Sequence, residues 1–160
     1  MIIRSVALAA VLCAAAAASA VGQDLPAFTV TAPDGTPTSS SVLERPGQWL
    51  LVYVAPGSVP SDRFLQALGE SWSDARAARV IFLVSGSVEG ARAHLAAKGG
   101  ESLAANATWY ADPDRAAWKA LGFTGTLAVA GIIGAHSDWR IDGVISDPSV
   151  LDPSVQAWIR

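Results

Sequence analysis

Two serines three residues apart, Ser58 and Ser61, have the type and spacing to do chemistry. They follow an unbroken apolar run, Leu50–Ala55, and a Pro-Gly turn, and they open a segment whose apolar residues recur at helical spacing. A hydroxyl at a helix start acts as a nucleophile only if a base lies within hydrogen-bonding reach. Without a base, it caps the helix by accepting a hydrogen bond from a backbone N–H.

The chain has only two histidines, and we expect neither to act as a base for Ser58. His94 falls within a predicted helix and His136 within a predicted hairpin turn, so we expect both at the solvent-exposed surface. The sequence also lacks the closing glycine of a Gly-x-Ser-x-Gly nucleophile elbow. We therefore interpret Ser58 as a helix cap, with Pro60 in the first turn, where its missing N–H costs nothing.

The sequence indicates no cofactor and no metal ion. Its two histidines stand at unrelated positions without cysteine partners, which does not make a zinc or copper site. Asp112 and Asp114 flank a proline at a predicted helix start, where capping is favoured over cation binding. No Gly-rich phosphate loop is present.

These residues must be positioned by a chain in which strands and helices alternate. Apolar runs at 50–55 and 79–85 predict central strands covered on both faces, and 107–111 predicts a shorter third strand. Helices are expected after each strand, beginning at Ser58, Ser87 and Asp112. The flanking elements complete the pattern: an edge strand at 28–31 that a Pro-Asp-Gly turn closes into a hairpin, a short helix near 38–43, a hairpin of 126–133 with 138–145, and a closing helix in 152–160.

This order predicts one α/β domain at 21–160, with a central mixed sheet and helices on both faces. Residues 1–20 have the features of a cleaved signal peptide: a positive Arg4, the apolar run Val6–Ala18 and a small-x-small cleavage site. The apolar run is too short to favour a membrane anchor, so no membrane span is expected after cleavage. We therefore expect export to the periplasm or the extracellular space.

Cleavage would remove Arg4, the only charged residue of the leader, and change the net charge from −3 to −4. No basic stripe remains, so nucleic acid is not an expected partner. Cys13 is the only cysteine, and it too lies in the leader. Lipidation at Cys13 is disfavoured because Leu12 stands where a small residue is needed. The mature domain would have no thiol.

Five stretches, in order, resemble the thioredoxin-like superfamily, in particular redoxins such as TlpA-like periplasmic thiol:disulfide oxidoreductases and peroxiredoxins. The resemblance covers about residues 25–160 and depends on the order of the stretches. They are Leu25-Pro26-Ala27-Phe28, Asp34-Gly35, Leu51–Ala55 with the helix after it, Asp112-Pro113-Asp114 through Thr126, and Trp139–Gly143. The resemblance implies a thioredoxin-like three-layer sandwich.

Catalytic members of that superfamily have Cys-x-x-Cys at the start of the helix and a cis-proline in a facing loop. The matching positions here are Ser58-Val59-Pro60-Ser61 and Leu127, and Gly57 replaces the tryptophan that often precedes the first cysteine. Dithiol exchange needs a thiolate and a sulfur that forms a mixed disulfide. A helix N-terminus can lower the pKa of a cysteine to near neutrality, but a serine hydroxyl remains protonated.

The sequence therefore leads to the hypothesis of an exported thioredoxin-like protein without redox cysteines, which acts in binding, as a scaffold or as an accessory subunit. The resemblance implies a groove for a protein or peptide partner, at Pro56, Gly57, Ser58, Thr126 and Leu127. Such grooves bind extended backbone as an added strand. The alternative is a thiol-disulfide oxidoreductase of redoxin type, involved in redox homeostasis; the missing sulfurs argue against it. The oligomeric state is not predicted.

Overall fold

A computed structural model of the chain describes residues 22–142 and 151–160. The predicted signal peptide, Cys13 and the end of the predicted second hairpin, up to Ile145, lie outside the described residues. Within the described part, no helix has both the length and the apolar character needed to cross a membrane.

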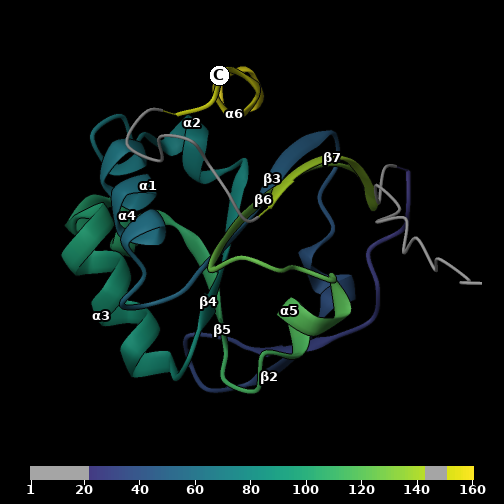
Figure 1. The fold of residues 1–160 in the computed structure, drawn as a ribbon, viewed down its shortest axis with the longest axis horizontal. Helices are drawn as coiled ribbons and strands as arrows, with labels where there is room; N and C mark the ends of the chain where they lie inside the picture. Colours follow the sequence, from purple (N-terminus) through teal and green to yellow (C-terminus); the bar gives the residue numbers. More distant parts are fainter. Residues whose placement is uncertain (1–21, 143–150) are drawn as a thin grey trace, which may run out of the picture.

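The described residues form one seven-stranded sheet with the strand order β2-β1-β5-β4-β3-β6-β7 (Figure 1). Its centre is parallel: β3 pairs with β4, and β4 with β5. Antiparallel strands flank this centre, β6 and β7 beyond β3, and β1 and β2 beyond β5. The strands are β1 (Thr29–Thr31), β2 (Pro37–Ser39), β3 (Gln48–Val54), β4 (Val80–Ser85), β5 (Thr108–Asp112), β6 (Leu127–Ile133) and β7 (His136–Asp142).

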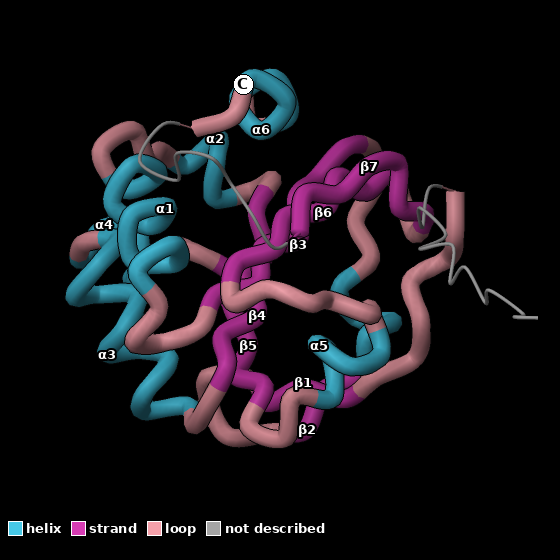
Figure 2. The backbone as a smooth tube through the Cα atoms, in the orientation of Figure 1, coloured by secondary structure: helices cyan, strands magenta, loops and turns pink. Residues whose placement is uncertain are grey.

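Helices cover both faces of the sheet (Figures 1 and 2). Strand β3 shows how one strand serves two cores, because alternate side chains point to opposite faces. Leu50, Val52 and Val54 pack with α1, α3, α4 and α6, whereas Leu51 and Tyr53 pack with η1 and α5. The helices are η1 (a 3₁₀ helix, Ser40–Leu43), α1 (Val59–Gly69), α2 (Asp74–Ala77), α3 (Val88–Gly99), α4 (Glu101–Asn106), α5 (Ala116–Ala120) and α6 (Pro153–Trp158).

The structure confirms the predicted α/β class, the mixed sheet and its helical layers. Three local predictions were wrong. Strand β1 is not an edge strand, because it lies between β2 and β5. The second hairpin turns at Gly134-Ala135, so His136 and Ser137 belong to β7. Helix α5 begins at Ala116, after Asp112 rather than at it. The sequence analysis also did not predict the short helices α2 and α4.

Candidate functional site at the start of helix α1

The candidate site lies where β3 ends and α1 begins, at the carboxyl edge of the parallel strands. Gly57 makes the turn possible, because its φ of +80° is readily adopted only by glycine. The Ser58 N–H donates to the Ala55 carbonyl at 3.2 Å and closes the turn. Ser58 then caps α1, as predicted, with its Oγ accepting from the Ser61 N–H at 3.5 Å. Sequence and local geometry therefore agree on this helix start.

Ser61 is a buried structural hydroxyl, with none of its surface exposed. Its Oγ accepts a hydrogen bond from the Ala55 N–H at 3.0 Å and donates one to the Thr126 carbonyl at 2.7 Å. One side chain thus joins the end of β3, the first turn of α1 and the residue before β6. Because buried polar backbone groups need partners, this hydroxyl stabilises the junction.

The predicted facing segment does lie beside Ser58. The Oγ1 of Thr126 is 2.6 Å from the Oγ of Ser58, and either oxygen can be the donor. Leu127, predicted to match the cis-proline position, is only 1% exposed and packs in the core, so Thr126 forms the surface here. The described residues contain no cis peptide bond.

Asp142 holds the loop that presents Thr126. Its carboxylate accepts hydrogen bonds from the N–H groups of Gly125 and Thr124, each at 2.9 Å, and pairs with the Arg140 guanidinium at 2.8 Å. Burial raises the pKa of Asp142, but those N–H groups and Arg140 outweigh it and hold the pKa below its usual value. The loop is therefore fixed by an ionised carboxylate from β7.

The surface around this junction is open and partly apolar. Pro56, Gly57 and Thr126 are exposed, and Val59 is 60% exposed on the first turn of α1. Of the five predicted groove residues, four reach the surface to some degree, while Leu127 does not. We use the name groove for the surface of Pro56, Gly57, Ser58, Val59 and Thr126.

One of the two histidines was misplaced by the sequence analysis. His94 is only 7% exposed, because the face of α3 that carries it packs against α1. Its Nε2 lies 3.8 Å from Asp62 Oδ1, and Asp62 also pairs with Lys98 at 3.0 Å. Burial lowers the pKa of His94, and the Asp62 charge only partly opposes this shift. His136 is exposed, as predicted.

The hydrogen bonds of Ser58 run to Thr126 and Ser61, and neither histidine is a partner in the part of the chain that the structure describes. Asp112 is fully buried and accepts hydrogen bonds from the N–H groups of Ala117 at 3.2 Å and Trp118 at 3.1 Å, in the first turn of α5. It pairs with these N–H groups from outside the helix, because the N-cap position of α5 is Arg115 and not Asp112. Residues 22–142 and 151–160 hold no cluster of three or more side chains able to bind a metal ion.

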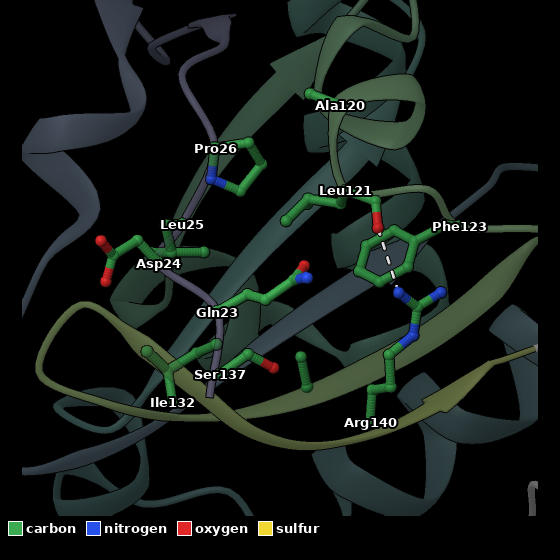
Figure 3. A pocket seen from close by; sticks show the side chains of 11 residues that line it. Gln23, Asp24, Leu25, Pro26, Ala120, Leu121, Phe123, Ile132, Ser137 and Arg140 are labelled. Atoms are coloured by element: carbon green, nitrogen blue, oxygen red, sulfur yellow. Dashed lines mark hydrogen bonds between the residues drawn. The ribbon is translucent and has the colours of Figure 1, made fainter. Parts of the chain in front are cut away.

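A separate pocket of about 110 Å³ lies between the N-terminal segment, α5 and strands β6 and β7 (Figure 3). Both of its charged lining residues are already engaged: Asp24 pairs with His136, and Arg140 donates to the carbonyls of Leu121 at 3.1 Å and Gly122 at 2.9 Å and pairs with Asp142. The remaining lining is largely apolar, with Leu25, Phe123 and other core residues. This pocket is therefore packing space beside the core rather than a second polar site.

Solved structures with the same architecture include proteins named as thiol-redox proteins. A secreted disulfide oxidoreductase of Mycobacterium tuberculosis, homologous to DsbE of E. coli, has a TM-score of 0.63 at 13% identity, with 82% of this chain and 93% of that chain covered. A putative thiol:disulfide interchange protein DsbE from Chlorobium tepidum also has a TM-score of 0.63, at 15% identity, covering 88% of this chain and 98% of that one. The protein has a thioredoxin-like fold.

A peroxidoxin of M. tuberculosis, BcpB, shares this thioredoxin-like fold with a TM-score of 0.61 at 13% identity, over 88% of this chain and 96% of that chain. No protein-family model and no curated protein matches the sequence. The likeness therefore lies in the backbone architecture. The redoxin resemblance of the sequence and the fold agree with each other, and the chain has a single cysteine, Cys13, outside the described residues.

Sequence reasoning missed one contact and one residue of the site. The Thr126 hydroxyl was named as part of the groove, but nothing in the sequence pairs it with Ser58 across 68 positions. Asp142 was assigned only to a hairpin. In the sequence, a carboxylate on the outer strand is only a weak signal that it holds the Gly-Thr loop. Its partners are backbone N–H groups, which do not depend on residue type.

Proposed function

We propose that this protein is an exported thioredoxin-like domain that does no redox chemistry and acts by binding, as a scaffold or accessory protein. The observation that carries the proposal is the state of the two hydroxyls that the resemblance matches to the cysteines of the redox motif. Ser61 is buried, and its hydroxyl forms hydrogen bonds with two backbone groups. Ser58 caps α1 and contacts Thr126. These hydroxyls stabilise the fold, and an oxygen atom cannot take part in reversible thiol-disulfide exchange.

The groove supports the binding role. Val59 places an apolar side chain, 60% exposed, beside the exposed Pro56 and Gly57 at the carboxyl edge of the sheet. An extended peptide could contact this apolar surface and the Thr126 segment next to it. We propose residues 1–20 as its signal peptide and the periplasm or extracellular space as its location.

Two assays test the absence of redox chemistry. The full chain and a Cys13→Ala variant are assayed for insulin-disulfide reduction and for peroxide consumption. We expect both proteins to match buffer in both assays. Turnover by the Cys13→Ala variant, which has no thiol, would overturn the proposal and favour the oxidoreductase alternative.

The binding role is tested with two matched substitutions. A library of extended peptides is screened against the full chain, against Val59→Ser, and against Val42→Ser as control. Val42 is exposed to a similar extent, 64%, but lies on η1. We expect Val59→Ser to lose binding of the selected peptides and Val42→Ser to retain it. Equal binding by all three proteins would place the binding surface outside the groove.

A further inference from the structure

A second cavity lies beside the groove, at the same carboxyl edge of the sheet. Its volume is about 180 Å³, and it is lined from four directions: β3, the end of β4, α5 and the loop before β6. Drug-sized ligands occupy roughly 300–1,000 Å³, so this pocket suits a small chemical group. Thr126 belongs to both features, because it lines the cavity and contacts Ser58 in the groove.

The wall of the cavity contains a polar atom without a partner. Tyr53 is 1% exposed, and its hydroxyl makes no hydrogen bond with any residue that the structure describes. Burial and the Asp112 charge raise the pKa of this phenol, and the Ser85 and Arg115 side chains, close enough for longer polar contacts with the hydroxyl, act in the opposite direction. The phenol therefore remains a protonated donor at neutral pH. Buried polar atoms are usually satisfied, so an unpaired donor at a cavity is a position where an ordered water or a ligand oxygen would accept a hydrogen bond.

The charge of the lining selects the class of ligand. Arg115 is its only charged residue, and its guanidinium lies 3.9 Å from the centroid of the Trp118 ring. Arg115 forms no ion pair within the described ranges 22–142 and 151–160. Asp112 is nearby, but it does not line the cavity, and both of its oxygens accept N–H groups of α5. A phenol, two aliphatic hydroxyls and a free guanidinium form a donor-rich, positive lining.

We propose that this cavity binds a carboxylate group, held by Tyr53 and Arg115 and flanked by Ser85 and Thr126. The carboxylate belongs either to a small free acid or to an acidic side chain of a bound peptide. Guanidinium and hydroxyl donors form strong, charge-assisted hydrogen bonds to carboxylates. The site goes beyond the proposed groove, because its lining and its ligand chemistry differ from those of the apolar surface at Val59.

The first experiment titrates the ¹⁵N-labelled full chain with acetate and, separately, with acetamide, its neutral analogue of similar shape. Nuclear magnetic resonance follows the indole N–H of Trp118 and the amide of Thr126. We expect saturable shifts with acetate and none with acetamide. The blocked tripeptides acetyl-Gly-Asp-Gly-amide and acetyl-Gly-Asn-Gly-amide form the peptide arm. Saturable shifts with the aspartyl peptide, and none with the asparaginyl peptide, identify an acidic side chain as the source of the carboxylate.

The second experiment assigns the contacts. Tyr53→Phe removes only the unpaired hydroxyl, and Arg115→Asn removes the charge with a residue that tolerates the left-handed φ of 56°. Each variant should weaken binding by at least about tenfold, the usual effect of losing a hydrogen bond to a charged group. Tyr110→Phe is the matched control, because Tyr110 is the only other tyrosine and does not line the cavity.

Two results would overturn the proposal. One is the absence of saturable shifts with both acetate and the aspartyl peptide; the other is equal binding of acid and amide. These outcomes involve wild-type protein only, so a variant that fails to fold does not affect them. They are also independent of the redox assays and of the Val59 comparison. The cavity proposal and the proposed function can therefore fail separately.

Discussion

The Ser61→Ala substitution tests whether the buried hydroxyl holds the site together. It removes two partly buried hydrogen bonds and leaves the N–H of Ala55 and the carbonyl of Thr126 without that partner. Each such bond contributes about 1 kcal/mol net, and unpaired buried groups add to the cost. The higher helix propensity of alanine offsets about 0.5 kcal/mol of this loss in stability. We expect the free energy of unfolding to fall by about 2 kcal/mol.

Urea unfolding followed by circular dichroism measures this loss, with an unchanged m-value showing that only stability has changed. The control is Ser102→Ala, an exposed serine on α4, which should alter stability by less than about 0.5 kcal/mol. If Ser61→Ala costs no more than this control, the hydroxyl does not stabilise the junction. The structural role assigned to Ser61 would then be wrong.

Three further predictions concern the surrounding frame. Gly69→Ala should cost about 1–3 kcal/mol in urea unfolding, because its Cβ would overlap the carbonyl oxygen of Gly99 where α1 meets α3. The lowered pKa of His94 means that the unfolded chain binds more protons than the fold, so stability should fall as pH drops below about 6.5. Unfolding at several pH values should show a weaker fall between pH 7 and 5 in His94→Gln. Asp142→Asn should speed amide hydrogen exchange at Thr124 and Gly125.

Each of these predictions has an outcome that contradicts it. A Gly69→Ala protein as stable as the parent would show that the helices separate without cost. An identical pH dependence in His94→Gln would assign the acid sensitivity to other groups. Unchanged exchange at Gly125 would show that the Asp142 carboxylate does not hold the loop.

The sequence predicted the central elements because each has a strong local signal. The run at 50–55 is apolar on both faces, and β3 is indeed covered by two separate cores. Ser58 at a Pro-Gly turn predicted the start of α1, and Ser87 and the Gly99-Gly100 pair bounded α3. These signals involve residues close in the chain, so local rules suffice.

The predictions failed where contacts between residues distant in the chain determine burial and strand pairing. A histidine on a helix of low amphipathicity was predicted to be exposed, but the close approach of α1 and α3 at Gly69 and Gly99 buries that face. Strand β1 was predicted to be an edge strand. The prediction was wrong because β5, which is distant from β1 in the chain, pairs with it in the folded sheet. Tyr53 and Arg115 line one cavity for the same reason, and a lone tyrosine in an apolar run gives no sign of a cavity.

The central claim is that the frame of a thiol-redox site remains while hydroxyls occupy the positions of its sulfurs. Insulin-disulfide reduction tests this claim most directly when the Cys13→Ala protein is compared with the same protein carrying Ser58→Cys, Ser61→Cys and Leu127→Pro. We predict turnover by the restored variant and none above buffer by its parent. Turnover by the parent, or a correctly folded variant with neither exchange nor a shifted thiol pKa, would contradict the claim.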